Sequence, residues 1–179
     1  MKQKQLSAQK YFKTRLKNLP YHECYINTEY KEKGLSQVLI SKKQASGKYA
    51  YIIFLLDVYC LGLKNCIYNF NLDDFEYKQM KDKLFSSEEF MPFDIVAAHN
   101  LIYGTIDAAQ EIGFAPHKEF AIAGHILDEE LIDDGIDVVE FGKNGKPLYI
   151  SGPYDDTDRI IRTLERTVGA GNFEFMHGF

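Results

Sequence analysis

Residues Tyr49–Leu63 read YAYIIFLLDVYCLGL, and this stretch decides the fold. Thirteen of its fifteen residues are apolar, on both of the faces that a strand would present. Such a run is typical of a central strand covered on each side, and it is shorter than the ~20 residues of a membrane-spanning helix. Gln37–Lys42 precedes it across a turn at Ser46-Gly47, and Cys66–Phe70 follows it across a turn at Gly62. Three sequential strands with short connections predict an antiparallel β-meander.

Helical spacing replaces the strand period after Asp73. Asp73 or Asp74 is suited to begin a helix that runs to Phe85, and Asp94 to begin one that runs to Ile112, because aspartate caps the free N–H groups of a first turn. The pattern further predicts a short strand at 24–26, a helix over 117–127, a late hairpin of 137–141 with 147–150 around Asn144-Gly145, a helix over 155–168 and a strand at 172–176. We therefore predict an α+β fold in which an antiparallel β-meander packs against helices, with a late hairpin and a C-terminal helix.

A length of 179 residues with 45% hydrophobic residues is that of one globular domain and excludes a disordered chain. Ala8, Phe12, Leu16 and Leu19 recur at helical spacing and form one apolar stripe, and Pro20 ends that helix. We predict a basic N-terminal helical extension over residues 1–19 and a single α+β domain over residues 20–179.

The start of the chain is polar, and it lacks the apolar segment of a secretory signal. Cys24, Cys60 and Cys66 are odd in number and include no C-x-x-C pair, which argues against a disulfide framework and a zinc ribbon. These features predict a cytoplasmic protein with free thiols and no membrane-spanning segment.

Charge is distributed unevenly along the chain. The formal net charge is -5, but residues 1–17 carry six basic residues and no acid, so the rest carries -11. Such a basic segment could contact an acidic partner surface or phosphate, and it could also be only the solvated face of a helix. The candidate partner-binding residues are Lys10, Lys13, Arg15 and Lys17.

Asp57 is the one residue inside the apolar stretch that is charged at neutral pH, so the sequence predicts a buried carboxylate. A buried carboxylate must be paired, hydrogen-bonded, bound to a metal or protonated. The structural alternative is that Asp57 accepts N–H bonds from the tight turn at 61–64 or pairs with Lys64. The functional alternative is a hydrolase or transferase site formed by Asp57, Lys64, His117 and Tyr154, with Asp57 as general base or metal ligand and His117 as proton carrier.

Other titratable residues give weaker signals. His99 lies on the apolar face of its predicted helix, which favours a core histidine bonded to a carbonyl, and His117 and His125 are too far apart along a helix to chelate one ion by themselves. The acidic residues of 128–137 and 155–158 fit a solvated loop and a helix start. The sequence contains no Walker loop, dinucleotide fingerprint, nucleophile elbow or H-E-x-x-H motif. No metal site is predicted, and the sequence leaves any cofactor unknown.

Two strings carry a family resemblance: Leu56-Asp-Val-Tyr-Cys-Leu-Gly-Leu-Lys64 and Phe141-Gly-Lys-Asn-Gly-Lys-Pro-Leu-Tyr-Ile-Ser-Gly-Pro-Tyr154. Together with Gln37–Ile40 and Gly113–His117 they resemble a family of uncharacterised bacterial proteins, over about residues 20–175. The resemblance implies a bacterial origin and a single folded unit. It implies no activity and no catalytic residue.

The sequence lacks catalytic motifs and its charge is segregated, so we rank one class of function above the others. We expect a macromolecular binding or accessory module whose partner is a protein rather than nucleic acid. The hydrolase or transferase described above is one alternative. The other is nucleic-acid binding through the basic segment, helped by abundant Tyr and Phe that could stack on bases.

Overall fold

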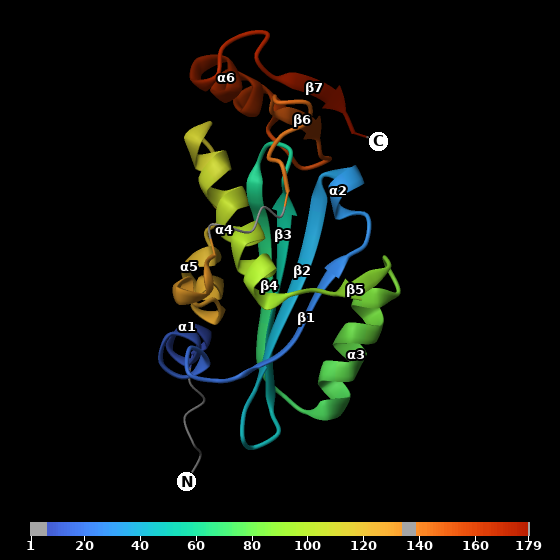
Figure 1. The fold of residues 1–179 in the computed structure, drawn as a ribbon, viewed down its shortest axis with the longest axis vertical. Helices are drawn as coiled ribbons and strands as arrows, with labels where there is room; N and C mark the ends of the chain where they lie inside the picture. Colours follow the sequence, from blue (N-terminus) through green and yellow to red (C-terminus); the bar gives the residue numbers. More distant parts are fainter. Residues whose placement is uncertain (1–6, 134–138, 179) are drawn as a thin grey trace.

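A five-stranded antiparallel sheet with the strand order β4-β3-β2-β1-β5 is the centre of the computed structural model, which describes residues 7–133 and 139–178 (Figure 1). Its strands are β1 (Tyr21–Asn27), β2 (Leu35–Lys43), β3 (Tyr49–Asp57), β4 (Gly62–Leu72) and β5 (Phe90–Pro92). The predicted meander is confirmed as β2-β3-β4, and β1 and β5 extend it on the β2 side. The α+β class is therefore confirmed.

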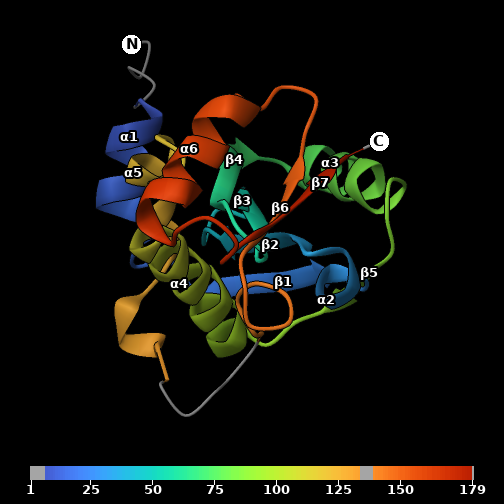
Figure 2. The ribbon, with the colours of Figure 1, turned by 90° about the horizontal axis from the view of Figure 1, so that it is seen from above.

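Strand β3 lies inside the molecule with both faces covered, as its sequence predicts. Ile52, Phe54 and Leu56 face the main core, whereas Tyr51 and Ile53 face a second core on the other side of the sheet. Helices α1 (Ala8–Tyr11), α4 (Ile95–Glu111) and α5 (Phe120–Ala123) cover the first face, and α3 (Asp74–Phe85) covers the second (Figures 1 and 2).

The predicted starts of the two long helices are confirmed by their caps. The Asp73 carboxylate accepts the Glu76 N–H at 2.9 Å, and the Glu76 carboxylate accepts the Asp73 N–H at 2.8 Å, which makes a capping box. Asp94 accepts the Ala97 N–H at 2.9 Å. The helix predicted over 117–127 is wrong as one continuous element, because its hydrogen bonds tighten at Gly124 and α5 passes into a 3-10 turn, Gly124–Ile126.

The N-terminal helix belongs to the main core. Helix α1 continues as a π-helical stretch, Phe12–Leu16, and Tyr11, Phe12 and Leu16 are all buried among the side chains of the sheet and α4. Burial of a side chain such as Phe12 stabilises a fold by roughly 1.5–3 kcal/mol. The predicted boundary at residue 19 therefore does not separate two cores, although the first six residues of the predicted extension lie outside the described residues.

A small unit caps the upper end of the sheet in Figure 1. It consists of β6 (Leu148–Ser151), α6 (Thr157–Thr167) and β7 (Glu174–His177), and β6 and β7 pair in parallel. The late turn is present, since Lys143 and Lys146 form an antiparallel bridge around Asn144-Gly145. The strand after this turn does not extend the hairpin, because it pairs with β7 and its Leu148 N–H donates to the Tyr59 carbonyl at 3.0 Å. Residues 137 and 138 of the predicted hairpin lie outside the described residues.

Strand β4 is an edge of the main sheet, and two asparagines bond to its own backbone. The Asn65 side-chain oxygen accepts the Cys66 N–H, and the Asn69 side-chain oxygen accepts the Phe70 N–H, both at 2.8 Å. These side chains occupy backbone donors that an edge strand would otherwise offer to another strand. As to membranes, none of the helices in the described ranges has the length and apolar character needed to cross one.

Candidate functional site

Asp57 ends β3 and bonds to the turn that follows it. Its side chain is buried, and one carboxylate oxygen accepts the N–H groups of Tyr59 and Cys60, both at 3.0 Å. Burial raises the pKa of Asp57 to about 6, although the nearby Lys64 charge and the backbone donors of Leu61, Tyr59 and Cys60 lower it in part. Asp57 therefore holds the β3–β4 turn together, as the structural alternative predicts, with donors that begin two residues earlier than predicted.

Lys64 joins this turn to the C-terminal unit. Its ammonium lies 3.4 Å from both carboxylate oxygens of Asp155, in a partly buried ion pair. Asp155 also accepts the Gly152 N–H at 2.8 Å and the Tyr149 hydroxyl at 3.2 Å. Tyr149 is fully buried beside Cys60 and stacks on Phe175 at 5.5 Å. The polar groups of Lys64, Asp155 and Tyr149 therefore hold β6, α6 and β7 against the sheet.

The four residues nominated for catalysis are only partly brought together. The His117 N–H donates to the Leu63 carbonyl at 3.0 Å, which places His117 next to the strand that carries Lys64, and its ring nitrogen Nδ1 accepts the Glu119 N–H at 3.4 Å. Tyr154 is 99% exposed and so contributes nothing to an enclosed site. The sequence pattern assigns Asp155 to a helix start and Tyr149 to a strand, and neither pattern signals that Asp155 meets both Lys64 and Tyr149.

Metal ligation has no support in the described ranges, 7–133 and 139–178, which contain no group of three His, Cys, Asp or Glu side chains suited to one ion. His99 is a core histidine, as predicted: it is fully buried and its Nδ1 lies 2.6 Å from the Ile95 carbonyl. Asp128 accepts the Glu130 N–H at the start of a 3-10 turn, Glu129–Leu131. Asp134 and Asp137 of the acidic run lie outside the described residues.

The basic residues of the N-terminal helix form the second candidate site. Their side chains are all exposed, and this set, which we call the basic face, consists of Lys10, Lys13, Arg15 and Lys17. Apolar residues of the same helix are buried: Tyr11 stacks on Phe70 at 4.5 Å, and Phe12 packs edge-on against Tyr68 at 5.1 Å. The helix therefore presents its cations from a fixed position.

A buried lysine anchors the end of this helix. Lys42 of β2 is 1% exposed, and its ammonium lies 3.3 Å from the carbonyl oxygens of both Leu16 and Lys17. The same group lies 4.2 Å from the centre of the Tyr21 ring. Burial lowers the pKa of Lys42 to about 8. A cation at this place satisfies carbonyls that the end of a helix leaves free, so Lys42 fixes the basic face to the sheet.

Comparisons with known proteins add little to this geometry. No family model matches the chain, and no solved structure matches it significantly. A 68-residue stretch is 34% identical to a protein named probable phosphoenolpyruvate synthase from Pyrococcus horikoshii. The match covers 34% of this chain and 8% of that protein, so the chain spans less than a tenth of the length of this relative.

Proposed function

We propose that this chain is a cytoplasmic binding or accessory module that recognises an acidic surface of a partner protein through the basic face. The observation that carries the proposal is the set of four exposed cations, in and directly after a helix whose apolar residues are buried and whose end is held by Lys42. In an otherwise acidic chain these cations would orient an acidic partner during encounter and fix its position after contact.

The anchored helix favours recognition by a preformed surface. A basic segment that was disordered before binding would lose backbone entropy on contact, and that loss would weaken the complex. Here Phe12 and Leu16 are fully buried and Lys42 bonds to the last carbonyls, so the helix is ordered before any partner arrives. The conformational entropy that is still lost on binding is that of the lysine and arginine side chains themselves.

A protein partner fits this surface better than single-stranded nucleic acid does. Proteins that bind single strands combine cations with exposed aromatic rings on which bases stack. Tyr11 and Phe12 are the rings of the basic helix, and both are buried against Phe70 and Tyr68. The basic face therefore offers charge without a stacking platform.

A hydrolase or transferase centred on Asp57 has less support. Asp57 already accepts two N–H groups of its own turn, and Lys64 already pairs with Asp155. A catalytic base must be able to reach a substrate proton. Asp57 is buried within its own turn and Lys64 is paired with Asp155, so both groups bond to the turn and to the attached C-terminal unit.

The test compares two variants with the same change in charge. One replaces Lys10, Lys13, Arg15 and Lys17 with Gln; the other replaces exposed residues elsewhere, Lys78, Lys83, Lys118 and Arg162, with Gln. Binding to a labelled poly-glutamate peptide and to a labelled single-stranded DNA is measured by fluorescence anisotropy at low and at moderate salt.

We expect the wild-type chain to bind poly-glutamate in a salt-sensitive manner, with affinity reduced about tenfold in the first variant and little changed in the second. Equal losses in the two variants would show that net charge alone is responsible and would overturn the proposal. Tighter binding to DNA than to poly-glutamate would favour the nucleic-acid alternative, and head-to-tail self-association that saturates the basic face, detected by sedimentation, would also overturn the proposal.

A further inference from the structure

A cavity of about 370 Å³ lies beside the basic face, between the N-terminal helix and the turn that joins β2 to β3. One wall comes from the helix and the residues that follow it, including Tyr11, Arg15 and Leu19, and the other from the turn, including Gln44 and Ala45. Cavities of about 300–1,000 Å³ are typical of sites for small molecules. This cavity is therefore large enough for one side chain of a partner.

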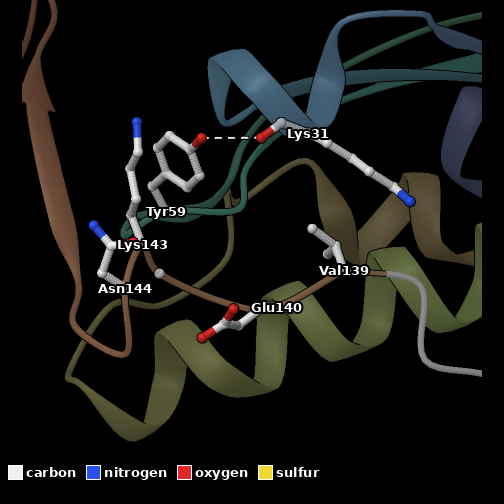
Figure 3. A pocket seen from close by; sticks show the side chains of 7 residues that line it. Lys31, Tyr59, Val139, Glu140, Lys143 and Asn144 are labelled. Carbon is white, nitrogen blue, oxygen red and sulfur yellow. Dashed lines mark hydrogen bonds between the residues drawn. The ribbon is translucent and has the colours of Figure 1, made fainter.

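A larger cavity, of about 700 Å³, lies beside the β3–β4 turn, and its charges do not converge. Its walls include Lys31 of α2 (Tyr30–Lys33), and Glu140 and Lys143 also line it. The side chains of Glu140 and Lys143 point away from each other (Figure 3). In the cavity beside the basic face, by contrast, Arg15 is the only charged residue among the described residues of the lining.

Hydrogen bonds hold the two walls of the smaller cavity together. The Gln44 side-chain amide donates to the Tyr11 hydroxyl and so joins the turn to the helix. Within the turn, the Gln44 N–H donates to the Lys48 carbonyl at 2.8 Å, and the Gly47 N–H donates to the Gln44 carbonyl at 2.9 Å. Leu19 is half-buried and packs against the main core. The cavity is thus formed before any partner binds.

Two hydroxyl groups of the lining are engaged within the protein. The Tyr11 hydroxyl accepts the hydrogen bond from Gln44. The Thr14 hydroxyl, which also belongs to a lining residue, donates to the Lys10 carbonyl at 2.7 Å. Leu19 and Ala45 add apolar surface to the same cavity. A partner would therefore meet apolar surface next to one cation.

The charge of Arg15 lies close to the cavity. Burial raises the pKa of Tyr11, and the positive charge of Arg15 opposes part of this rise, so the guanidinium lies near the Tyr11 hydroxyl. Among the described residues Arg15 is exposed and forms no ion pair. A guanidinium can bind a carboxylate through two parallel hydrogen bonds. Arg15 is thus placed to bind an acidic group of whatever enters the cavity.

We propose that the acidic partner carries one large apolar side chain, which enters this cavity while a nearby carboxylate of the same segment binds Arg15. This inference rests on the proposed function, because it names the feature that distinguishes the partner from any other acidic surface. An apolar side chain in a pocket commonly supplies much of the binding energy of an interface, and the surrounding charges position it. Since Arg15 itself lines the cavity, both contacts fall within one short segment of the partner.

The first experiment measures what the apolar side chain adds to charge. Two labelled glutamate peptides have the same length and differ in one central residue, which is leucine or alanine. Each is titrated into the full chain, and fluorescence anisotropy gives the dissociation constant. We expect the leucine peptide to bind about fivefold more tightly, because an open cavity would bury about half of a leucine side chain. This ratio should persist at moderate salt while both affinities fall, since salt screens the charges only.

The second experiment blocks the cavity without a change in charge. Ala45→Gln adds a longer, neutral side chain to the cavity wall, and Ala121→Gln makes the same change at an exposed position of α5. We expect the preference for the leucine peptide to disappear in the first variant and to remain about fivefold in the second. Both alanines are exposed, so the variants should fold like the wild type, which amide NMR spectra check.

The third experiment separates Arg15 from the rest of the basic face. Arg15→Gln and Lys13→Gln each remove one exposed positive charge, but of the two only Arg15 lines the cavity. We expect Arg15→Gln to weaken binding of the leucine peptide at least about threefold more than Lys13→Gln does. Equal losses would show that Arg15 acts only as one more charge, which would overturn its proposed contact.

The outcomes distinguish this inference from the proposed function. Equal binding of the two peptides, still dependent on the basic face, would overturn the inference and leave the acidic partner in place. Binding of neither peptide would overturn both. A preference for leucine that Ala45→Gln and Ala121→Gln change to the same extent would show that the apolar side chain binds elsewhere, and the inference would again be wrong.

Discussion

The Tyr21 hydroxyl lies 3.1 Å from Nε2 of His99, in the buried layer between β1 and α4. Because Nδ1 of His99 lies 2.6 Å from the Ile95 carbonyl, Nδ1 carries the proton and Nε2 is an acceptor. The Asp128 N–H donates to this same Nε2 at 2.9 Å, and the Tyr21 hydroxyl also lies 3.0 Å from the Ile126 carbonyl. One neutral imidazole therefore links β1, α4 and the segment that follows α5.

His99 should resist protonation in the folded protein. Burial lowers the pKa of His99 below its ordinary value of 6.5, outweighing the Ile95 hydrogen bond and the Asp128 charge, which act in the opposite direction. As the pH falls through 6.5 the unfolded chain takes up this proton first, so His99 reduces stability on the acid side of that value. Nitrogen-15 imidazole spectra should show the Nδ1–H tautomer at pH 6.5, and an imidazolium there would contradict the assignment.

Asp57 should give the opposite dependence on pH. Its folded pKa of about 6 is above its ordinary value of 3.8, so the folded state holds this proton more tightly than the unfolded chain does. The resulting stabilisation is complete below 3.8 and is lost as the pH rises to about 6, an effect of up to about 3 kcal/mol. Urea unfolding of the wild type and of Asp57→Asn should be compared across this window. The free energy of unfolding of the wild type should fall relative to that of the variant as the pH rises. A constant difference would mean that Asp57 does not titrate in this range.

Lys42 should make the fold more stable in mild alkali. Its folded pKa of about 8 is below the ordinary 10.5, so between these values the unfolded chain binds more protons and stability rises with pH, by up to about 3 kcal/mol. Lys42→Met removes this dependence and leaves the carbonyls of Leu16 and Lys17 without their donor. Between these two pH values, the free energy of unfolding of the wild type should rise relative to that of the Lys42→Met variant. The control Lys118→Met, at an exposed site, should show the same dependence on pH as the wild type.

Gly34 should be intolerant of a side chain for two separable reasons. Its φ of 71° favours glycine, and a Cβ there would overlap the Tyr59 ring. Gly47 has a φ of 81° but has nothing within 4 Å of a Cβ, so Gly47→Ala measures the backbone cost alone. We expect Gly47→Ala to cost about 1 kcal/mol in the free energy of unfolding and Gly34→Ala clearly more, above about 2 kcal/mol. Equal costs would show that the Tyr59 ring moves aside freely.

The sequence predicts those parts of the fold whose causes are local. Asp73 and Asp94 cap the helices they were predicted to begin, and the apolar run before Asp57 forms a strand covered on both faces. The pairing of β6 with β7 was not predicted, because it depends on the α6 crossover and on Tyr149 meeting Phe175 far along the chain. Local spacing carries no information about such a contact.

The candidate sites divide in the same way. Burial of Asp57 follows from its apolar neighbours, and exposure of the basic face follows from helical spacing. Lys42 could not be identified as an anchor, since a lysine near the end of a strand is usually solvated and only the return of Leu16 and Lys17 to β2 gives it acceptors. The partnership of Lys64 with Asp155 spans 91 residues and likewise depends on the completed fold.

Asn65 and Asn69 hinder the addition of a further strand to the sheet along β4. A strand from another molecule that approached β4 would find the N–H groups of Cys66 and Phe70 already engaged, and it would have to displace two amide side chains before a ladder could start. Edge-to-edge assembly through β4 is therefore disfavoured at these two positions, because each displaced amide would lose a hydrogen bond before the new one forms.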